Sequence, residues 1–234
     1  MIDEGQLRQA LANVAESLAR DRSVADVLHD LVDDATRVFD ICGAGISMAD
    51  AQGRLRSVTA LSESIASLEM IEERTRQGPC HEVHDLGKPL RISDLRDHAD
   101  RWPDLARAAE KAGVVAAAGV PLHIEDAEFG VLTLYDTRPR QWTDRQIEAA
   151  QLLADTTTGY IVYASAYREA TEVVAQLEHA LETRIIVEQA KGVLANERSI
   201  SVDAALQILR RHARNHNAKL SVVAHAVVNL DLRP

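Results

Sequence analysis

Basic side chains gather without acids near the carboxyl-terminal end of an otherwise acidic chain. The 234 residues include 36 acids and 26 bases, yet no carboxylate lies between Asp203 and Asp231. An even spread of charge would place roughly four acids in a segment of this length. A surface that excludes negative charge suits a polyanion, because fixed cations attract its phosphates. The bases and histidines of the segment are Arg210, Arg211, His212, Arg214, His216, Lys219 and His225.

A predicted helix places the central bases of this segment on one stripe. Ser201 is a suitable N-cap for that helix. Residues three, four and seven positions apart lie along one side of a helix, so the bases can follow a phosphate backbone. The alternative is an ordinary solvated face, which usually includes acids as ion-pair partners. The stripe consists of Gln207, Arg210, Arg211 and Arg214.

The stripe is predicted to lie in a helical tail that follows a long helix in the sequence. Thr143 followed by Gln146 has the pattern of a capping box, and no proline interrupts the chain up to about Asn196. The sequence therefore predicts a long helix here, a second helix after Ser201 and a third helix. The apolar side of the third helix carries Leu220, Val223, Ala224 and Val227.

A narrow apolar seam runs along the long helix. Helical spacing of a few apolar residues over a polar helix is typical of a coiled coil, so we expect a homodimer that joins two copies of this helix. The alternative is packing against the chain's own sheet. The seam consists of Val174, Leu177, Leu181 and Ile185.

The preceding part of the chain mixes helical and strand patterns. A polar turn at Asp50–Gly53 joins two short strands into a hairpin, and Gly78–Pro79 ends a helix and opens a loop-rich middle. Two apolar strands around the polar turn 125–128 should lie centrally in an antiparallel sheet. The predicted elements are helices over about 5–40, 62–76 and 103–112, and strands over 41–48, 55–61, 90–92, 114–124 and 129–135.

Composition excludes several classes of protein. The longest nearly apolar run, Ala112–Leu122, is too short for a membrane span, and the acidic start indicates a cytoplasmic protein rather than a secretory leader. Cys42 and Cys80 are too few for a disulfide framework and lack the spacing of a zinc site, so no metal is predicted. No glycine-rich phosphate loop or nucleophile elbow occurs, which predicts that the protein is not an enzyme.

The carboxyl-terminal residues resemble the ANTAR domain. The resemblance covers about residues 172–230 and departs from the family pattern at Ala195–Glu197. It implies a three-helix module that binds RNA hairpins in nascent transcripts and prevents transcription termination, commonly as a dimer. The residues that carry it are Leu181–Leu194, which includes the specific core Arg184 and Glu188–Gly192, and then Ser201, Ala204, Ala205, Leu209–Arg214 and Asn217–Leu220.

The remaining two thirds resemble a GAF domain, a sensory fold with an antiparallel sheet, helices on one face and a ligand pocket on the other. The resemblance rests on the order of elements and on Gly78–Cys80, Pro121–Leu122 and Gly130–Leu132. Together the two resemblances imply an α+β fold. A GAF-like domain over residues 1–165 would be joined by a long helix to an ANTAR domain over residues 166–234.

Candidate RNA contacts follow from charge and from the resemblance. Guanidinium and ammonium groups suit phosphates, and amides suit base edges. Gly192 either lets nucleic acid approach closely or contacts another helix. From Thr171 onward the net charge is +1, so the sensor part carries −11 and should repel RNA. The candidates are Arg184, Gln189, Lys191, Gly192, Gln207, Arg210, Arg211, Arg214, Asn217 and Lys219.

The signal for the sensor part is left open by the sequence. Cys80 followed by His81 has the form of a bilin attachment site, but the whole chain has only two Phe, two Trp and four Tyr to line a tetrapyrrole pocket. Redox sensing by Cys80, an unidentified small ligand and a structural role are the alternatives. A further alternative is that the basic tail binds a protein partner rather than RNA.

Overall fold

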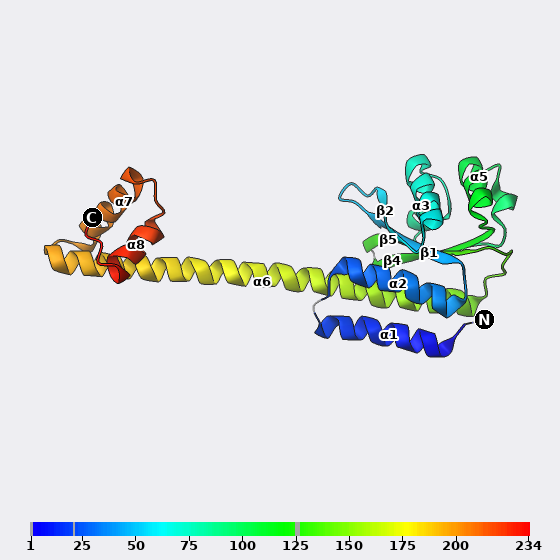
Figure 1. Cartoon of the computed structure of the whole chain (residues 1–234), viewed down its shortest axis with the longest axis horizontal. Coiled ribbons are helices and arrows are strands. Elements are labelled where there is room, and N and C mark those ends of the chain that lie inside the picture. The colour runs from blue at the N-terminus through cyan, green and yellow to red at the C-terminus, as the bar shows by residue number, and fades with distance from the viewer. Residues whose placement is uncertain (1, 21, 125–126) are drawn as a thin grey trace. The chain divides into compact units, whose positions relative to one another are not determined.

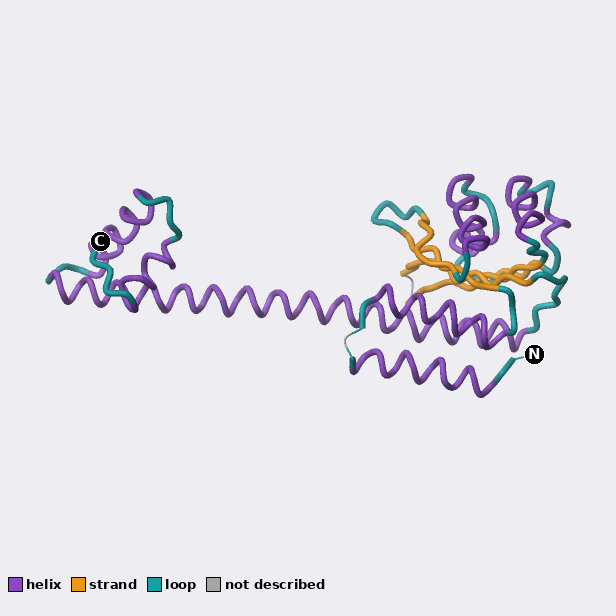
Figure 2. Tube along the Cα trace, viewed as in Figure 1, coloured by secondary structure: helices purple, strands orange, loops and turns teal. Residues whose placement is uncertain are grey.

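The computed structural model describes residues 2–20, 22–124 and 127–234. The chain consists of two compact units, Met1–Ser165 and Ala166–Pro234. The first unit is an antiparallel sheet with helices, and the second consists of helices (Figure 1, Figure 2). One helix, α6 (Asp144–Arg198), contributes residues to both units. The predicted α+β fold is confirmed.

The sheet of the first unit has five strands in the order β2-β1-β5-β4-β3, and every neighbouring pair is antiparallel. The predicted hairpin forms because the carboxylate of Asp50 accepts the N–H groups of Gln52 at 2.9 Å and Arg54 at 3.0 Å. The strands are β1 (Gly43–Ala49), β2 (Leu55–Ala60), β3 (Leu90–Ile92), β4 (Ala116–Ile124) and β5 (Ala127–Asp136). Residues 125 and 126, in the predicted turn, lie outside the described residues.

Helices cover both faces of this sheet (Figure 1). Alternation along β5 directs Leu134 toward the layer of α1, α2 and α6, whereas Tyr135 packs with Ile65 and Leu68 of α3. The expectation of helices on one face only is wrong, because α3, α4 and α5 bury their apolar sides on the second face. Their bounds, with those of the first two helices, are α1 (Glu4–Ala19), α2 (Val24–Phe39), α3 (Glu63–Thr75), α4 (Pro79–Leu86) and α5 (Pro103–Ala112).

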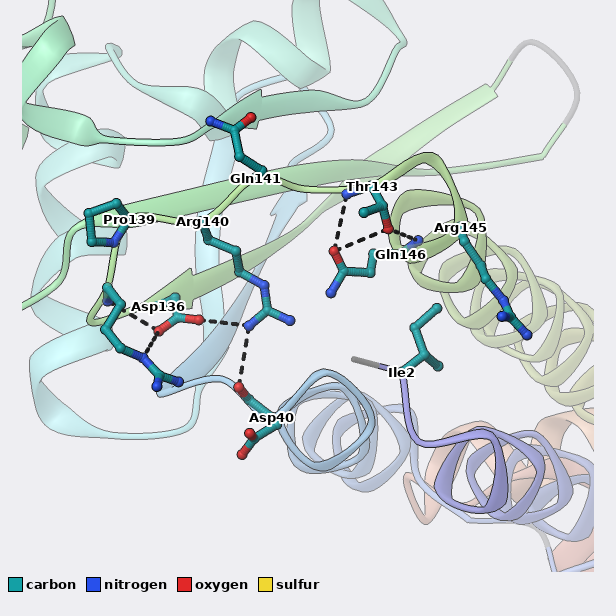
Figure 3. A pocket seen from close by; sticks show the side chains of 10 residues that line it. Ile2, Asp40, Asp136, Pro139, Arg140, Gln141, Thr143, Arg145 and Gln146 are labelled. Atoms are coloured by element: carbon teal, nitrogen blue, oxygen red, sulfur yellow. Dashed lines mark hydrogen bonds and ion pairs between the residues drawn. The ribbon is translucent and has the colours of Figure 1, made fainter.

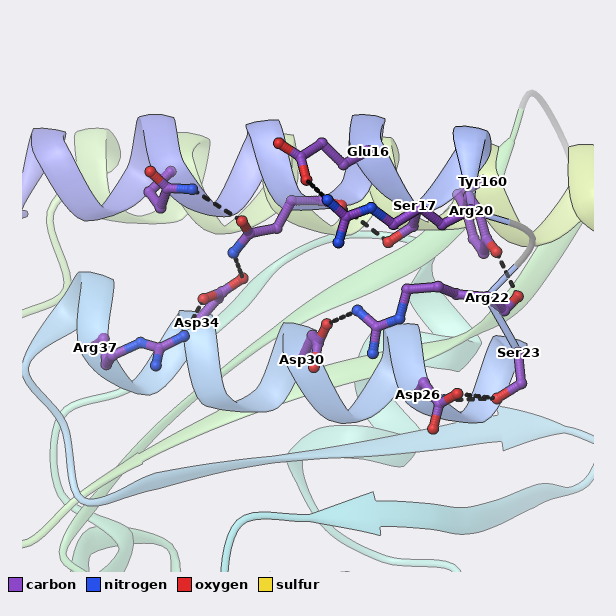
Figure 4. A network of polar contacts seen from close by, with 12 residues as sticks. Glu16, Ser17, Arg20, Arg22, Ser23, Asp26, Asp30, Asp34, Arg37 and Tyr160 are labelled. Carbon is purple, nitrogen blue, oxygen red and sulfur yellow. Dashed lines mark hydrogen bonds and ion pairs between the residues drawn. The ribbon is translucent and has the colours of Figure 1, made fainter.

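The single helix predicted over residues 5–40 is two helices, α1 and α2. Ser23 begins α2 as its N-cap, because its hydroxyl accepts the backbone N–H of Asp26 at 3.1 Å. Polar contacts join the helices of this layer (Figure 4): Arg22 pairs with Asp30, and the hydroxyl of Tyr160 in α6 donates to the Arg22 carbonyl at 2.6 Å. The helical spacing continued through the break, so the cap was the only local signal.

The loop expected after Gly78 is a helix, α4. Pro79 occupies its first turn, where its missing N–H costs no hydrogen bond, and Gly87 ends it in the left-handed conformation at φ 60°. His81 and His84 both lie on this helix.

The second unit contains the three predicted helices. The last part of α6 packs with α7 (Val202–Asn215) and α8 (Leu220–Asn229) around a small apolar core. Ser201 caps α7 through a hydrogen bond from the N–H of Ala204 at 3.2 Å. The core includes Ala190, Leu194, Ala205, Leu209, Val223, Ala224 and Val227.

Candidate nucleic-acid interface and sensor interior

The basic stripe of α7, formed by Gln207, Arg210, Arg211 and Arg214, is exposed along its whole length. The opposite side of α7 is buried, as Leu209 shows at 0% exposure. Among the described residues, no acid lies within ion-pair distance of the three arginines. Their guanidinium groups are therefore open to an external anion.

Two further candidates follow the stripe in the connection to α8. Asn217 is exposed and has a left-handed backbone at φ 48°, a conformation that Asn tolerates better than most residues. Lys219 is exposed at the N-cap position of α8. Both side chains thus lie at the surface immediately beyond the end of α7.

The candidates on α6 differ from one another. Arg184 and Gln189 are exposed, and a Cβ atom added to Gly192 would meet nothing within 4 Å, so no other part of the described chain packs on that glycine. Lys191 is largely covered, with 11% of its side chain exposed, and its ammonium group lies 2.7 Å from the carboxylate of Glu188. This ion pair competes with any anion for Lys191.

The apolar seam of α6 is exposed to solvent in the single chain. The exposed fractions are 52% for Val174, 64% for Leu177, 59% for Leu181 and 48% for Ile185. Exposed apolar side chains in such a continuous row are a signature of an interaction surface.

A groove of about 610 Å³ lies between α6 and α8 in the second unit. Ile185 of the seam and Gln189 of the candidate RNA contacts both line it, together with Val222 and Leu230. The last two are exposed by 59% and 73% and were not singled out from the sequence. Val222 is the neighbour of Val223 in the sequence and does not share the helical spacing of the apolar side of α8. That spacing therefore does not predict a role for Val222.

Two glutamates of α3 are buried in the first unit, facing the sheet. Glu69 is 0% exposed and Glu72 is 1% exposed. The hydroxyl of Tyr135 lies 2.7 Å from Glu69 Oε1 and 3.2 Å from Glu72 Oε1. Ser47 Oγ donates to Glu69 Oε2 at 2.7 Å. The sequence did carry a signal: residues 65, 68, 69 and 72 follow one helical face, and acids occupy two of these apolar positions.

Burial raises the pKa of both glutamates. Desolvation, followed by the charge of Glu69, raises the pKa of Glu72 well above its usual value. Desolvation also raises the pKa of Glu69, although hydrogen bonds from Ser47 and Tyr135 oppose that shift. The Tyr135 hydroxyl lies within hydrogen-bond distance of both carboxyl groups and, with one proton, can donate to one of them at a time.

Cys80 lacks the environment of a redox-sensing thiol. Its side chain is 1% exposed, and desolvation together with the nearby charges of Glu72 and Glu69 raises the pKa of its thiol well above 9.0. Redox sensors are exposed thiols with a lowered pKa. Cys42 is partly buried, and desolvation likewise raises its pKa.

Two family models match the chain. The GAF domain model matches residues 23–161, and the ANTAR domain model matches residues 175–228. No helix in the described residues combines the length and apolar character needed to cross a membrane.

A curated protein and two solved GAF domains are similar to the chain. The chain is 26% identical over 227 residues to diguanylate cyclase DgcP of Escherichia coli K12; this alignment covers 95% of the chain and 62% of the relative, which is longer. The GAF domain of a phosphoenolpyruvate-protein phosphotransferase from Acinetobacter has a TM-score of 0.54 at 14% identity, covering 70% of this chain and 97% of that domain. The phycoerythrobilin-bound GAF domain of a cyanobacterial phytochrome has a TM-score of 0.53 at 13% identity, covering 69% and 97%. At these identities the structures establish the fold alone.

Proposed function

Because the chain belongs to the family of proteins that join a GAF domain to an ANTAR domain, we propose that it is an RNA-binding regulator controlled by its GAF domain. In this proposal the ANTAR domain binds hairpins in nascent transcripts and prevents transcription termination. The GAF domain senses a ligand or another signal. The architecture is that of a sensor and regulator rather than an enzyme.

The observation that carries the proposal is the unpaired basic stripe. Arg210, Arg211 and Arg214 project from one rigid helix, are exposed and have no acid partner among the described residues. The free energy of binding a phosphate backbone comes mainly from such fixed cations and the counterions they release. An ordinary solvated face would place acids beside these arginines.

Base recognition is assigned to two exposed amides. Asn217 follows α7 directly, and Gln189 lies exposed on α6. No Phe, Tyr or Trp occurs after Tyr167. RNA recognition by this unit must therefore rely on hydrogen bonds and charge, and not on the aromatic stacking that many RNA-binding proteins use. The Glu188 ion pair makes Lys191 a weaker contributor than the arginines of the stripe.

The seam supports a dimer that presents two ANTAR domains together. Val174, Leu177, Leu181 and Ile185 are each about half exposed or more, and burying them in a coiled coil would remove a continuous apolar row from water. A signal that changes the first part of α6 would act on the same helix that carries this seam. The sensor thereby alters the arrangement of the two RNA-binding surfaces.

The proposal is tested with purified full-length protein and a transcription template that carries a two-hairpin leader followed by an intrinsic terminator. We expect the protein to increase read-through, and to bind the leader RNA with an affinity that falls steeply as salt concentration rises. Unchanged read-through over the range of protein concentrations that saturates the RNA would refute antitermination.

A protein partner is the second candidate. The basic stripe would then dock on an acidic protein surface, and an excess of hairpin RNA would not displace that partner. Lack of binding to any hairpin leader, with retained capture of an acidic protein by the tail, would favour this alternative.

A further inference from the structure

A pocket of about 630 Å³ lies in the first unit where α6 begins (Figure 3). The end of α2, the end of β5 and the connection from Arg138 to Thr143 form its walls. It is separate from the buried Glu69 and Glu72, neither of which lines it. The positive end of the α6 dipole adjoins it, which favours an anion there.

Gln146 supplies a free donor to this pocket. Its side chain is 7% exposed, and its oxygen accepts the backbone N–H of Thr143 at 3.1 Å, which fixes the orientation of the amide. The amide nitrogen therefore points the other way, and it has no hydrogen-bond partner among the described residues. The amide nitrogen is not itself buried, so it is open to the pocket and can donate to a ligand oxygen there.

Arg140 faces Gln146 across the pocket (Figure 3). It is fixed by three contacts, which are Asp136 Oδ2 at 2.6 Å, the Phe39 carbonyl at 2.7 Å and the Asp40 carbonyl at 3.3 Å. A guanidinium group has five N–H donors, so two remain for a ligand. The guanidinium of Arg140 also lies 4.6 Å from the centre of the Trp142 ring, which holds it rigid.

The carboxylates that line the pocket do not occupy all of its hydrogen-bond donors. Asp136 is 4% exposed and its charge is taken up by Arg140 and by the backbone N–H of Arg138 at 3.2 Å. Figure 3 shows the carboxylate of Asp40 turned away from Arg140. Arg138 has a side chain that is 76% exposed and only a long ion-pair contact, 3.9 Å, to Asp136. Arg145, which also lines the pocket, pairs with Glu4. The remaining arginines and aspartates of the lining balance in charge, so the excess is one of hydrogen-bond donors.

We propose that this pocket is a binding site for a small oxyanion, a carboxylate or phosphate compound, held by the amide of Gln146 and by Arg140 and Arg138. Its volume is in the range of sites that hold a small organic molecule. The ligand would contact the first turn of α6, where Thr143 and Gln146 set the start of the helix. Binding at this site does not require RNA, so it can be tested apart from the proposed function.

The test measures binding to full-length protein by isothermal titration calorimetry and thermal unfolding, with inorganic phosphate and citrate as probes and chloride of equal ionic strength as the reference. We expect at least one oxyanion to raise the melting temperature of the first unit by about 3–6 °C at twenty times its Kd. The two probes distinguish a phosphate site from a carboxylate site.

Gln146→Glu is the decisive variant, because a glutamate at this position keeps the oxygen that caps the helix but replaces the amide donor by a negative charge. It should weaken oxyanion binding at least about tenfold, whereas Arg138→Gln should weaken it about threefold. Arg20→Gln is the matched control, since Arg20 has a 72% exposed side chain at the C-cap of α1, outside the pocket, and the variant should bind as the wild type does.

Two results would overturn the proposed site. Equal affinity of the wild type and Gln146→Glu, or no oxyanion effect beyond that of chloride on the wild type, would overturn the site. If Gln146→Glu fails to fold, Arg138→Gln decides alone, and an unchanged affinity in that variant would count against the proposal. RNA binding by the same preparations tests the proposed function independently.

Discussion

The carboxylate of Glu72 accepts a hydrogen bond at 2.8 Å from the backbone N–H of Cys80, across the turn at Gly78. A Cβ atom at Gly78 would lie 2.2 Å from Glu72 Oε2, so the turn closes directly on this carboxyl group. Glu72 in turn contacts Tyr135 of β5. One buried acid therefore joins α3, the start of α4 and the sheet.

Glu72→Gln should flatten the pH dependence of stability. The pKa of Glu72 is raised in the folded protein, so the unfolded chain loses this proton first as pH rises. Its contribution to stability is complete below about pH 4.5, the unfolded value, and falls with rising pH at about 1.4 kcal/mol per pH unit until the folded pKa is reached. Urea unfolding at pH 5 and pH 8 should show a smaller decrease for the variant. A decrease equal to that of the wild type would mean that Glu72 is ionised in the fold.

Gly78→Ala should destabilise the first unit by more than about 2 kcal/mol, because φ is 131° and the new methyl group would meet the Glu72 carboxylate. Gly53→Ala is the matched control, since Gly53 also has a positive φ of 72° but a Cβ atom there would meet nothing within 4 Å. Chemical denaturation of both variants measures the difference. Equal losses would show that the contact with Glu72 is not a constraint.

Val174→Glu should convert a dimer into a monomer, whereas Val173→Glu should not. The two residues are neighbours with similar exposure, 52% and 49%, but only Val174 lies on the seam with Leu177 and Leu181. A charge in the centre of a coiled coil is costly, and a charge at its flank is tolerated. Light scattering after size-exclusion chromatography gives the mass of each variant. A monomeric wild type would contradict the seam as a dimer interface.

Cys80 should resist thiol reagents in the folded protein. The variant Cys42→Ser leaves Cys80 as the single cysteine, and its burial and raised pKa predict labelling only after unfolding. Labelling with a chromogenic disulfide reagent in buffer and in denaturant measures both rates. Rapid labelling in buffer would restore redox sensing as an explanation for this residue.

Most of the helices and strands could be predicted from local patterns. The strand Leu90–Ile92, the helix Pro103–Ala112 and the three helices of the second unit have the predicted positions, because caps and apolar periods coincide there. The break between α1 and α2 was missed because apolar spacing continues on both sides of Ser23. The Gly78–Pro79 pattern predicts a helix break and not α4, although Pro79 also suits the first turn of a helix.

The sites were less predictable than the elements. The basic stripe was visible as a lack of acids, which is a property of the sequence alone. The pocket at the start of α6 was not visible, because Arg140 gains its role from contacts with Phe39 and Asp40, about one hundred residues away in the chain. Glu69 and Glu72 show the intermediate case, in which acids on an apolar helix face indicate burial but not their shared partner, Tyr135.

The most direct test of RNA binding by the basic stripe is the salt dependence of hairpin affinity in Arg210→Ala/Arg211→Ala. Each lost phosphate contact should reduce the slope of log K against log salt by about one, so the double variant should show a slope reduced by one to two and a weaker affinity at low salt. Arg8→Ala/Arg20→Ala removes two exposed charges from α1 and serves as the control with an unchanged slope. An affinity and slope equal to those of the wild type, in a folded double variant of the stripe, would contradict the account.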